Sequence, residues 1–161
     1  KEYIDYVNET INIEPFDLIS DVAPAGLLYT YTASRTTKVY LRGDRVSQKV
    51  RCPNSSCSKT IGYSKTQSWT ASMSLNVAQR NAIGGGAGFS WTNSATVSSS
   101  ATLNIPAGHE GWWEFDPYMN FTTGTLKNRL TGTEWHLNAY SPIKLPNGNL
   151  DGTLFGVVNK I

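Results

Sequence analysis

The chain has 161 residues, a formal net charge of +2, and 16% charged residues. This length supports one domain with its own core, so we expect a single β-rich domain over residues 1–161. The small net charge and the scattered lysines and arginines argue against a nucleic-acid partner. No stretch approaches the roughly 18 apolar residues that a membrane-spanning helix needs.

The first part of the chain gives few signals. It begins at Lys1 without the basic-then-apolar pattern of a signal peptide, which fits a processed secreted protein or a trimmed chain. Pro15 precedes residues 16–22, where we predict one short helical turn, the only helix expected. Residues 27–32 and 37–42 are rich in aromatic and β-branched side chains and predict two strands.

The two cysteines, Cys52 and Cys57, enclose the loop Pro53-Asn54-Ser55-Ser56. This spacing is not that of a CxxC redox or zinc half-site, and further ligands are missing from the sequence nearby. We therefore predict a disulfide across a hairpin tip and no metal site. A disulfide implies an oxidising compartment, so we expect a secreted, extracellular protein.

Strict alternation of apolar and polar side chains dominates the middle of the chain. Odd-numbered positions are mostly apolar and even-numbered positions are mostly Ser, Thr or Asn in residues 66–77, and again in residues 87–105. Such a period of two is typical of β-strands. A glycine-rich joint, residues 82–86, separates the two stretches. We predict a long antiparallel hairpin over about residues 66–105, with one apolar and one hydroxyl face.

The hydroxyl face of this hairpin has almost no charge, whereas exposed strands usually carry charged side chains that prevent aggregation. Hydroxyl groups can satisfy one another and water without the desolvation cost of an ion. The face is therefore compatible with bulk water, the lumen of a barrel, a sugar surface or a second copy of itself. The sequence does not choose among these four.

The later part of the chain continues the β pattern. Residues 111–121 are the densest aromatic cluster, which predicts either a kinked core strand or a platform for sugar rings or a lipid interface. Further strands are expected over residues 123–130, 133–140 and 152–160. Without helical spacers for parallel crossovers, the fold class is all-β, as an elongated antiparallel sheet or a β-sandwich.

Catalytic motifs are poor, so we expect a non-enzyme without cofactors. Of the two histidines, His109 begins a His-Glu string that lacks the second His of a zinc protease. Glu110, Glu114 and Asp116 lie on one predicted strand, and this does not create the opposed pair of carboxylates that a glycosidase uses. A hydrolase that uses these three carboxylates is the least favoured hypothesis.

The alternating stretches, the glycine joint, and the closing Ile105-Pro106-Ala107-Gly108 before an aromatic strand resemble the pore-forming module of aerolysin-like toxins, of the epsilon-toxin and mosquitocidal-toxin type. The resemblance covers about residues 59–125. It implies a long-stranded sheet with an amphipathic hairpin that rearranges, after oligomerisation, into a transmembrane β-barrel. The polar side chains would face the lumen and the apolar ones the lipid.

The resemblance assigns roles to both faces of the hairpin. The lipid-facing side chains would be Trp69, Met73, Leu75, Val77, Phe89, Trp91 and Val97. The lumen-facing side chains would be Thr70, Ser72, Ser74, Ser90, Thr92 and Ser94. The expected partners are further copies of the chain, together with membrane lipid or a cell-surface receptor or glycan.

The sequence thus leads to two main hypotheses. The first is a secreted, non-enzymatic β protein that oligomerises and inserts its hairpin into membranes. The second is an extracellular carbohydrate-binding or structural, fibre-forming module. Its candidate contacts are Trp112, Trp113, Tyr118 and Trp135.

Overall fold

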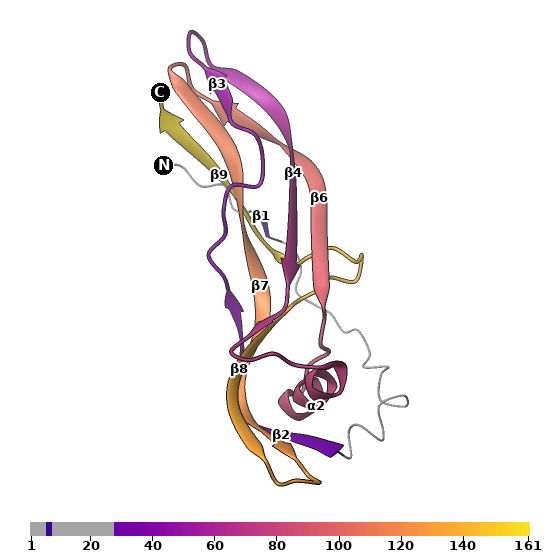
Figure 1. Ribbon diagram of the computed structural model, residues 1–161. Coiled ribbons are helices and arrows are strands. Elements are labelled where there is room, and N and C mark those ends of the chain that lie inside the picture. The colour runs from indigo at the N-terminus through magenta and orange to yellow at the C-terminus, as the bar shows by residue number, and fades with distance from the viewer. Residues whose placement is uncertain (1–5, 8–27) are drawn as a thin grey trace.

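A computed structural model describes residues 6–7 and 28–161 of the chain (Figure 1). The described part is elongated and built from antiparallel strands, with one helix, α2 (Val77–Ala87), so the all-β fold class is confirmed. The helical turn predicted over residues 16–22 lies outside the described residues. No helix in the described part is both long and apolar enough to span a membrane.

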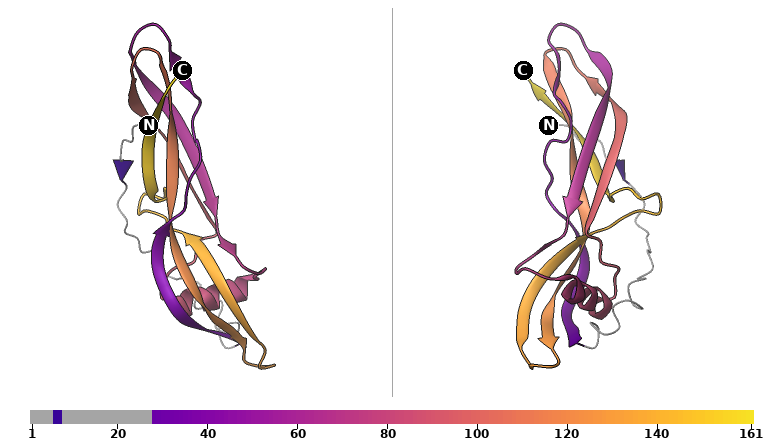
Figure 2. Two further views of the ribbon diagram at one scale, coloured as in Figure 1. Left: turned by 90° about the vertical axis from the view of Figure 1, so that its left-hand side faces the viewer. Right: turned by 45° about the vertical axis from the view of Figure 1, so that its right-hand side comes forward.

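The longest strand, β7 (His109–Asn128), runs through the whole length of the molecule (Figure 2). The first half of β7 pairs with β9 (Gly152–Lys160) and β3 (Val50–Cys52), which form the upper half in Figure 1. Its second half pairs with β2 (Tyr29–Tyr40) and β8 (Glu134–Pro142), which form the lower half. Two short strands, β1 (Tyr6–Val7) and β5 (Thr70–Ala71), pair with β9 and β8.

A separate two-stranded sheet, which we call the ribbon, lies beside the upper half of β7. It consists of β4 (Cys57–Ser68) and β6 (Ser94–Ile105), paired without a break from Cys57↔Ile105 to Ser68↔Ser94. Figures 1 and 2 show both strands running parallel to the long axis of the molecule. An alternating two-stranded ribbon therefore exists, but only residues 66–68 and 94–105 of it belong to the two limbs that were predicted to form the hairpin.

The boundaries predicted for this hairpin are wrong. The first limb was placed at residues 66–77, but β4 begins at Cys57 and ends at Ser68. The second limb was placed at residues 87–105, but β6 begins at Ser94. The glycine joint lies inside α2 and is not a turn. Residues 69–93, which we call the connecting segment, thus leave the ribbon and fold separately.

Two hydrophobic clusters divide the core along the long axis. The upper core lies between the ribbon and the β7–β9 sheet and contains Ile61, Tyr63, Val97, Leu103, Ile105, Trp113, Phe115, Leu150, Leu154 and Val158. The lower core lies between the connecting segment and strands β2, β7 and β8, and contains Tyr31, Leu75, Ile83, Leu126, Leu137 and Ala139. The lower core therefore depends on how the connecting segment folds.

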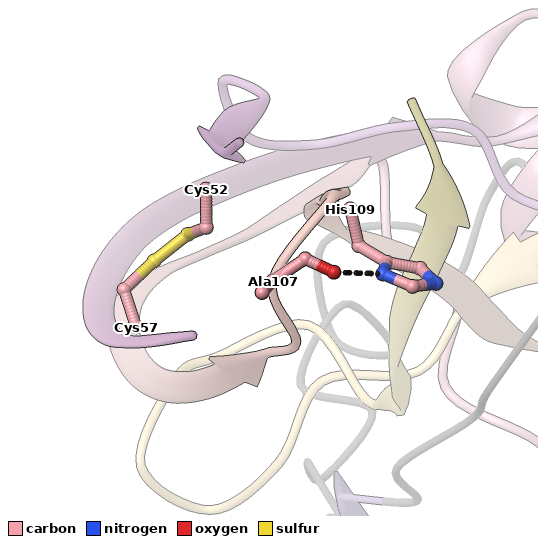
Figure 3. The surroundings of a disulfide bond; sticks show 4 residues. All are labelled: Cys52, Cys57, Ala107 and His109. Atoms are coloured by element: carbon pink, nitrogen blue, oxygen red, sulfur yellow. Dashed lines mark hydrogen bonds between the residues drawn. A yellow bond between two sulfur atoms is a disulfide. The ribbon is translucent and has the colours of Figure 1, made fainter. Parts of the chain in front are cut away.

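The Cys52–Cys57 disulfide is formed, as predicted, and joins the end of β3 to the start of the ribbon (Figure 3). The neighbouring turn is held by two further bonds. The Gly108 N–H donates to Cys52 O at 2.8 Å, and a hydrogen bond of 2.9 Å joins His109 Nδ1 and Ala107 O. This end of the ribbon is consequently fixed to the β7 sheet.

Replacing both cysteines by serine should lower stability only modestly. The loop that the bond closes spans a sequence separation of 5, and so short a loop restricts the unfolded chain little. We expect the Cys52→Ser/Cys57→Ser variant to lose about 2 kcal/mol or less of unfolding free energy in urea titrations. A variant that fails to fold at all would contradict this local role.

Candidate functional site

The outer face of the ribbon is an uninterrupted polar surface without charge. Every even-numbered residue from Ser58 to Ser68 and from Ser94 to Asn104 is exposed, and these residues are Ser, Thr, Asn or Gly. Opposed hydroxyls bond each other across the strands, as in Thr66 with Thr96 at 2.7 Å. Thr60 and Thr102 form the same kind of bond at 3.0 Å, so hydroxyls pair with one another at two places along this face.

The inner face of the ribbon is apolar and packs on the β7–β9 sheet. Ile61, Val97 and Leu103 are each at most 3% exposed there. Val97, one of the side chains assigned to lipid, therefore lies in the upper core. The two faces follow the parity of the residue number, although Lys59, Lys65, Gln67 and Ser99 interrupt the apolar parity.

The other apolar candidates lie in the connecting segment, where most are covered. Leu75 is 7% exposed in the lower core, with Trp69, Met73 and Trp91 packed against it. The rings of Trp69 and Trp91 lie 5.6 Å apart, and those of Phe89 and Trp91 lie 6.3 Å apart. Val77, at the start of α2, is 57% exposed. These side chains are brought together, but not as one ribbon face.

The polar candidates of the connecting segment are divided between solvent and the lower sheet, our name for β2, β8, β5 and the second half of β7. Three of them, Thr70, Ser72 and Ser74, are exposed, as is Ser94 at the start of β6, while Ser90 and Thr92 are partly buried. Ser72 bonds the neighbouring strand, since its hydroxyl accepts from the Asn138 N–H at 3.0 Å. The Thr92 N–H donates to Ser141 Oγ at 2.8 Å.

The alternation of the ribbon continues in phase through the connecting segment. Odd-numbered residues remain apolar from Trp69 to Val77 and from Ala87 to Trp91, and the even-numbered ones are Thr, Ser, Asn or Gly. The Trp69 N–H donates to Asn93 O at 3.0 Å, which continues the ribbon's pairing one step beyond Ser68↔Ser94. The sequence is thus compatible with a longer ribbon than the fold contains.

Extending the register shows how well the two limbs would match. Beyond Trp69 and Asn93, the same pairing would place Thr70 opposite Thr92 and Ser72 opposite Ser90. It would also place Met73 opposite Phe89 and leave the turn at Arg80-Asn81-Ala82. Hydroxyls would face hydroxyls and apolar groups would face apolar groups, which is the pairing that stabilises antiparallel strands.

Instead, the middle of the connecting segment forms α2, and the residues that flank this helix are typical helix caps. The Asn76 side chain accepts from the Gln79 N–H at 2.8 Å and the Gln79 side chain accepts from the Asn76 N–H at 2.9 Å, a complete capping box. Gly88 ends the helix with φ of 84°. This helix was not predicted, although Asn76, Gln79 and Gly88 are sequence signals for its two ends.

Several features weaken this helical state. Gly84, Gly85 and Gly86 lie within α2, and each glycine in a helix interior costs about 1 kcal/mol relative to alanine. The first turn has no acidic residue and the last turn has no basic one. Among the described residues, Asn81 Nδ2 and Trp91 Nε1 are buried without a hydrogen-bond partner. Packing on β2 must offset these costs.

The aromatic candidates of the second hypothesis do not form an exposed platform. Trp112 and Trp113 are 7% and 1% exposed, so their rings are covered. Tyr118 stacks on Tyr40 with centroids 4.3 Å apart, while Trp135 lies in the lower half near Tyr29. A sugar platform built from these four side chains is therefore not present on the described surface.

The carboxylates considered for hydrolysis have partners of another kind. Glu114 accepts from the Trp112 Nε1–H at 3.0 Å, and Asp116 accepts from the Gly43 N–H at 2.8 Å. The first bond lies within β7, whereas the second joins β7 to the chain that follows β2. In the described part of the chain, no cluster of His, Cys, Asp or Glu has the arrangement of a metal site.

A buried carboxyl lies where the two halves meet. Asp151 is 1% exposed, and burial raises its pKa to about 6, against the smaller opposing effects of a hydrogen bond from Gly152 and the charge of Lys38. Its Oδ2 has no hydrogen-bond partner among the described residues. Neutralising this carboxyl should therefore favour the folded state.

The sign of the pH dependence follows from the raised pKa. Because the folded chain holds this proton more tightly than the unfolded chain, its contribution to stability grows as pH falls through about 6 toward 4. The measurement is the free energy of unfolding in urea at pH 7, 5 and 4, for wild type and for Asp151→Asn. We expect the unfolding free energy of wild type to rise on acidification by up to about 3 kcal/mol relative to that of the variant. Parallel pH profiles of the two proteins would contradict this assignment.

Gly86 should be essential for docking α2 on β2. A Cβ at this position would lie 2.2 Å from Tyr31 O, a backbone atom that cannot move aside easily. We expect Gly86→Ala to displace the helix at a cost of about 1–3 kcal/mol, despite the better helix propensity of alanine. Hydrogen exchange over residues 77–87 should accelerate.

The matched control for this variant is Gly62→Ala in the ribbon. Its new Cβ would lie 3.8 Å from Ser99 O, an ordinary van der Waals distance. It should leave exchange of α2 unchanged. If the amides of α2 exchanged as slowly in the Gly86→Ala protein as in the control, the docking of the helix would not depend on the close approach of Gly86 to Tyr31.

Comparison with known proteins places the chain in a family. A crystal structure of the parasporin-2 Bacillus thuringiensis toxin that recognizes cancer cells is 11% identical, covering 98% of this chain and 93% of that chain at a TM-score of 0.26, a likeness too slight to assign a fold or function. No curated protein matches the sequence. The model of a family of unknown function, DUF6060, matches residues 27–159. The chain belongs to this DUF6060 family.

Proposed function

We propose that this chain is a secreted, non-enzymatic pore-forming protein whose connecting segment refolds to prolong the ribbon into a membrane. The soluble fold is the state described above. In the membrane state, residues 69–93 would leave the lower sheet and continue β4 and β6 as one hairpin. Several copies would close such hairpins into a transmembrane barrel.

One observation carries this proposal: residues 69–77 and 87–92 of the connecting segment have the alternation of the ribbon and are compatible with its register, yet the segment folds as the short strand β5, the helix α2 and irregular chain. Local sequence and fold normally agree, and disagreement concentrates at sites that function by changing. The bond between Trp69 N–H and Asn93 O shows that the register already extends past the ribbon. Refolding would then need no change of pairing in β4 and β6.

The length and faces of the prolonged hairpin suit a bilayer. A transmembrane strand needs about 9–11 residues, and residues 69–79 and 83–93 supply two limbs of that length. Between Thr66 and Ile105, Arg80 is the only charged residue, and it would lie at the turn that crosses to the far side. The odd-numbered side chains, apolar apart from Gln79, Gly85 and Asn93, would meet lipid, and the hydroxyls would meet water in the lumen.

The ribbon also offers edges to neighbouring copies. Neither β4 nor β6 has a strand partner outside the ribbon in the described part of the chain. Backbone bonds to residues outside it occur at Ser64, whose N–H donates to Val46 O at 3.2 Å, and at Thr96, whose carbonyl accepts from the Leu150 N–H at 3.1 Å. Open edges of this length favour pairing with another chain, which a barrel would complete.

Tethering the connecting segment to the lower sheet tests the proposal. Ala71 and Ala139 face each other in the β5–β8 pair, and the Ser72 N–H bond to Asn138 O makes them a non-hydrogen-bonded pair. Such pairs have Cα atoms about 4.5 Å apart, within disulfide range. We expect the oxidised Ala71→Cys/Ala139→Cys protein to lose at least about tenfold in dye leakage from vesicles or cells that the wild type permeabilises.

A second disulfide provides the matched control. Ser64 and Ser98 face each other within the ribbon and remain paired in both states, so the Ser64→Cys/Ser98→Cys protein should retain leakage when oxidised. Reduction should restore the first variant, with reduced wild type as reference for the native disulfide. Full leakage from the oxidised Ala71–Ala139 tether, or no permeabilisation by the wild type, would rule out this mechanism.

A further inference from the structure

A hollow of about 420 Å³ lies where the connecting segment meets the lower sheet. One wall comes from residues 88–92, which follow α2, and the other from β2, β7 and the chain after β8. This volume lies within the range of about 300–1,000 Å³ found for small-molecule sites. The hollow is distinct from the ribbon face and from the aromatic candidates considered above.

The lining of the hollow is positively charged. Lys38 from β2 and Lys144 from the chain after β8 both contribute to it, and no Asp or Glu lines it among the described residues. The buried carboxyl of Asp151 interacts with the Lys38 charge. Two ammonium groups from separate elements favour an anionic group between them, since each donates several hydrogen bonds.

The remaining lining matches a sugar better than a bare anion. Phe89 offers a partly buried aromatic ring of the kind on which the apolar face of a sugar ring stacks. Thr37, Thr92 and Asn120, also partly buried, add hydroxyl and amide groups that can bond sugar hydroxyls. A phosphate ion would occupy a small part of the volume and would leave the ring and the amide unused.

We infer that this hollow binds the acidic terminal sugar of a glycan, one that bears a carboxylate or a sulfate. The lysines hold the anionic group, Phe89 supports the ring, and the threonines and Asn120 bond its hydroxyls. Binding to the fold described here does not require pore formation. If the proposed function also holds, the ligand would bridge residues 88–92 and the lower sheet. Because only the soluble state has this site, the bound ligand would stabilise that state relative to the membrane state.

The test is direct binding to the intact soluble protein, which needs no membrane. N-acetylneuraminic acid and galactose 6-sulfate serve as acidic probes, with N-acetylglucosamine and inorganic phosphate as comparators, measured by NMR titration. We expect at least one acidic sugar to shift the amides of Thr37 and Asn120, and to bind at least tenfold more tightly than either comparator. The Lys38→Gln/Lys144→Gln and Phe89→Leu variants should each weaken it at least tenfold.

The control is Lys59→Gln/Lys160→Gln, which removes the same charge from exposed positions on β4 and β9, outside the hollow. It should bind as wild type does. Equal affinity for phosphate would show a simple anion site, and competition by phosphatidylserine vesicles would show a lipid site. Either result overturns the proposal, as does the absence of binding by both acidic sugars to the wild type.

Discussion

The packing of the connecting segment against the lower sheet is the interaction on which the described fold depends. Leu75 and Ile83 are buried there, and they complete a core with Tyr31 and Leu126. Without this cover, the apolar side chains of residues 69–93 would face water, and the lower sheet would lose one side of its core. Burial therefore overrides a sequence whose alternation favours extended strands, because tertiary contacts routinely outweigh local propensity.

The rest of the fold anchors the ribbon at its upper end only. Strand β7 carries both cores, so the upper half can remain intact while the lower half changes. The disulfide and the bonds around Gly108 fix the upper end of the ribbon, whereas its lower end continues into the connecting segment. A ribbon fixed at one end and extendable at the other is what the proposed insertion requires.

The faces of the strands could be predicted from the sequence, but the extent of the strands could not. Alternation places Val97 inside and Thr96 outside wherever the chain is extended, and a loop as short as Cys52–Cys57 favours a disulfide. Alternation cannot say where the extended state ends. That depends on the Asn76–Gln79 capping box, on Gly88, and on whether β2 offers a surface for Gly86.

Features assembled from distant parts of the chain were beyond sequence reasoning. Trp113 is part of a buried core because the ribbon and β9 cover it, and neither cover is visible in the string of aromatic residues. Lys38 and Lys144 have no shared motif, and the fold alone brings them to one hollow. The resemblance to aerolysin-like toxins implied a hairpin that changes state, while the alternation placed its limbs at residues 66–77 and 87–105 and not at the observed Cys57–Ser68 and Ser94–Ile105.

The most direct test of the account follows the environment of single side chains on the membrane. An environment-sensitive dye would be attached to cysteines introduced one at a time over residues 70–75 and 88–92 of membrane-bound protein. The account predicts blue-shifted emission at odd-numbered positions and aqueous emission at even-numbered ones, a period of two in both limbs. Emission without a period of two, or emission unchanged from the soluble protein, would show that these two stretches do not become the limbs of a hairpin.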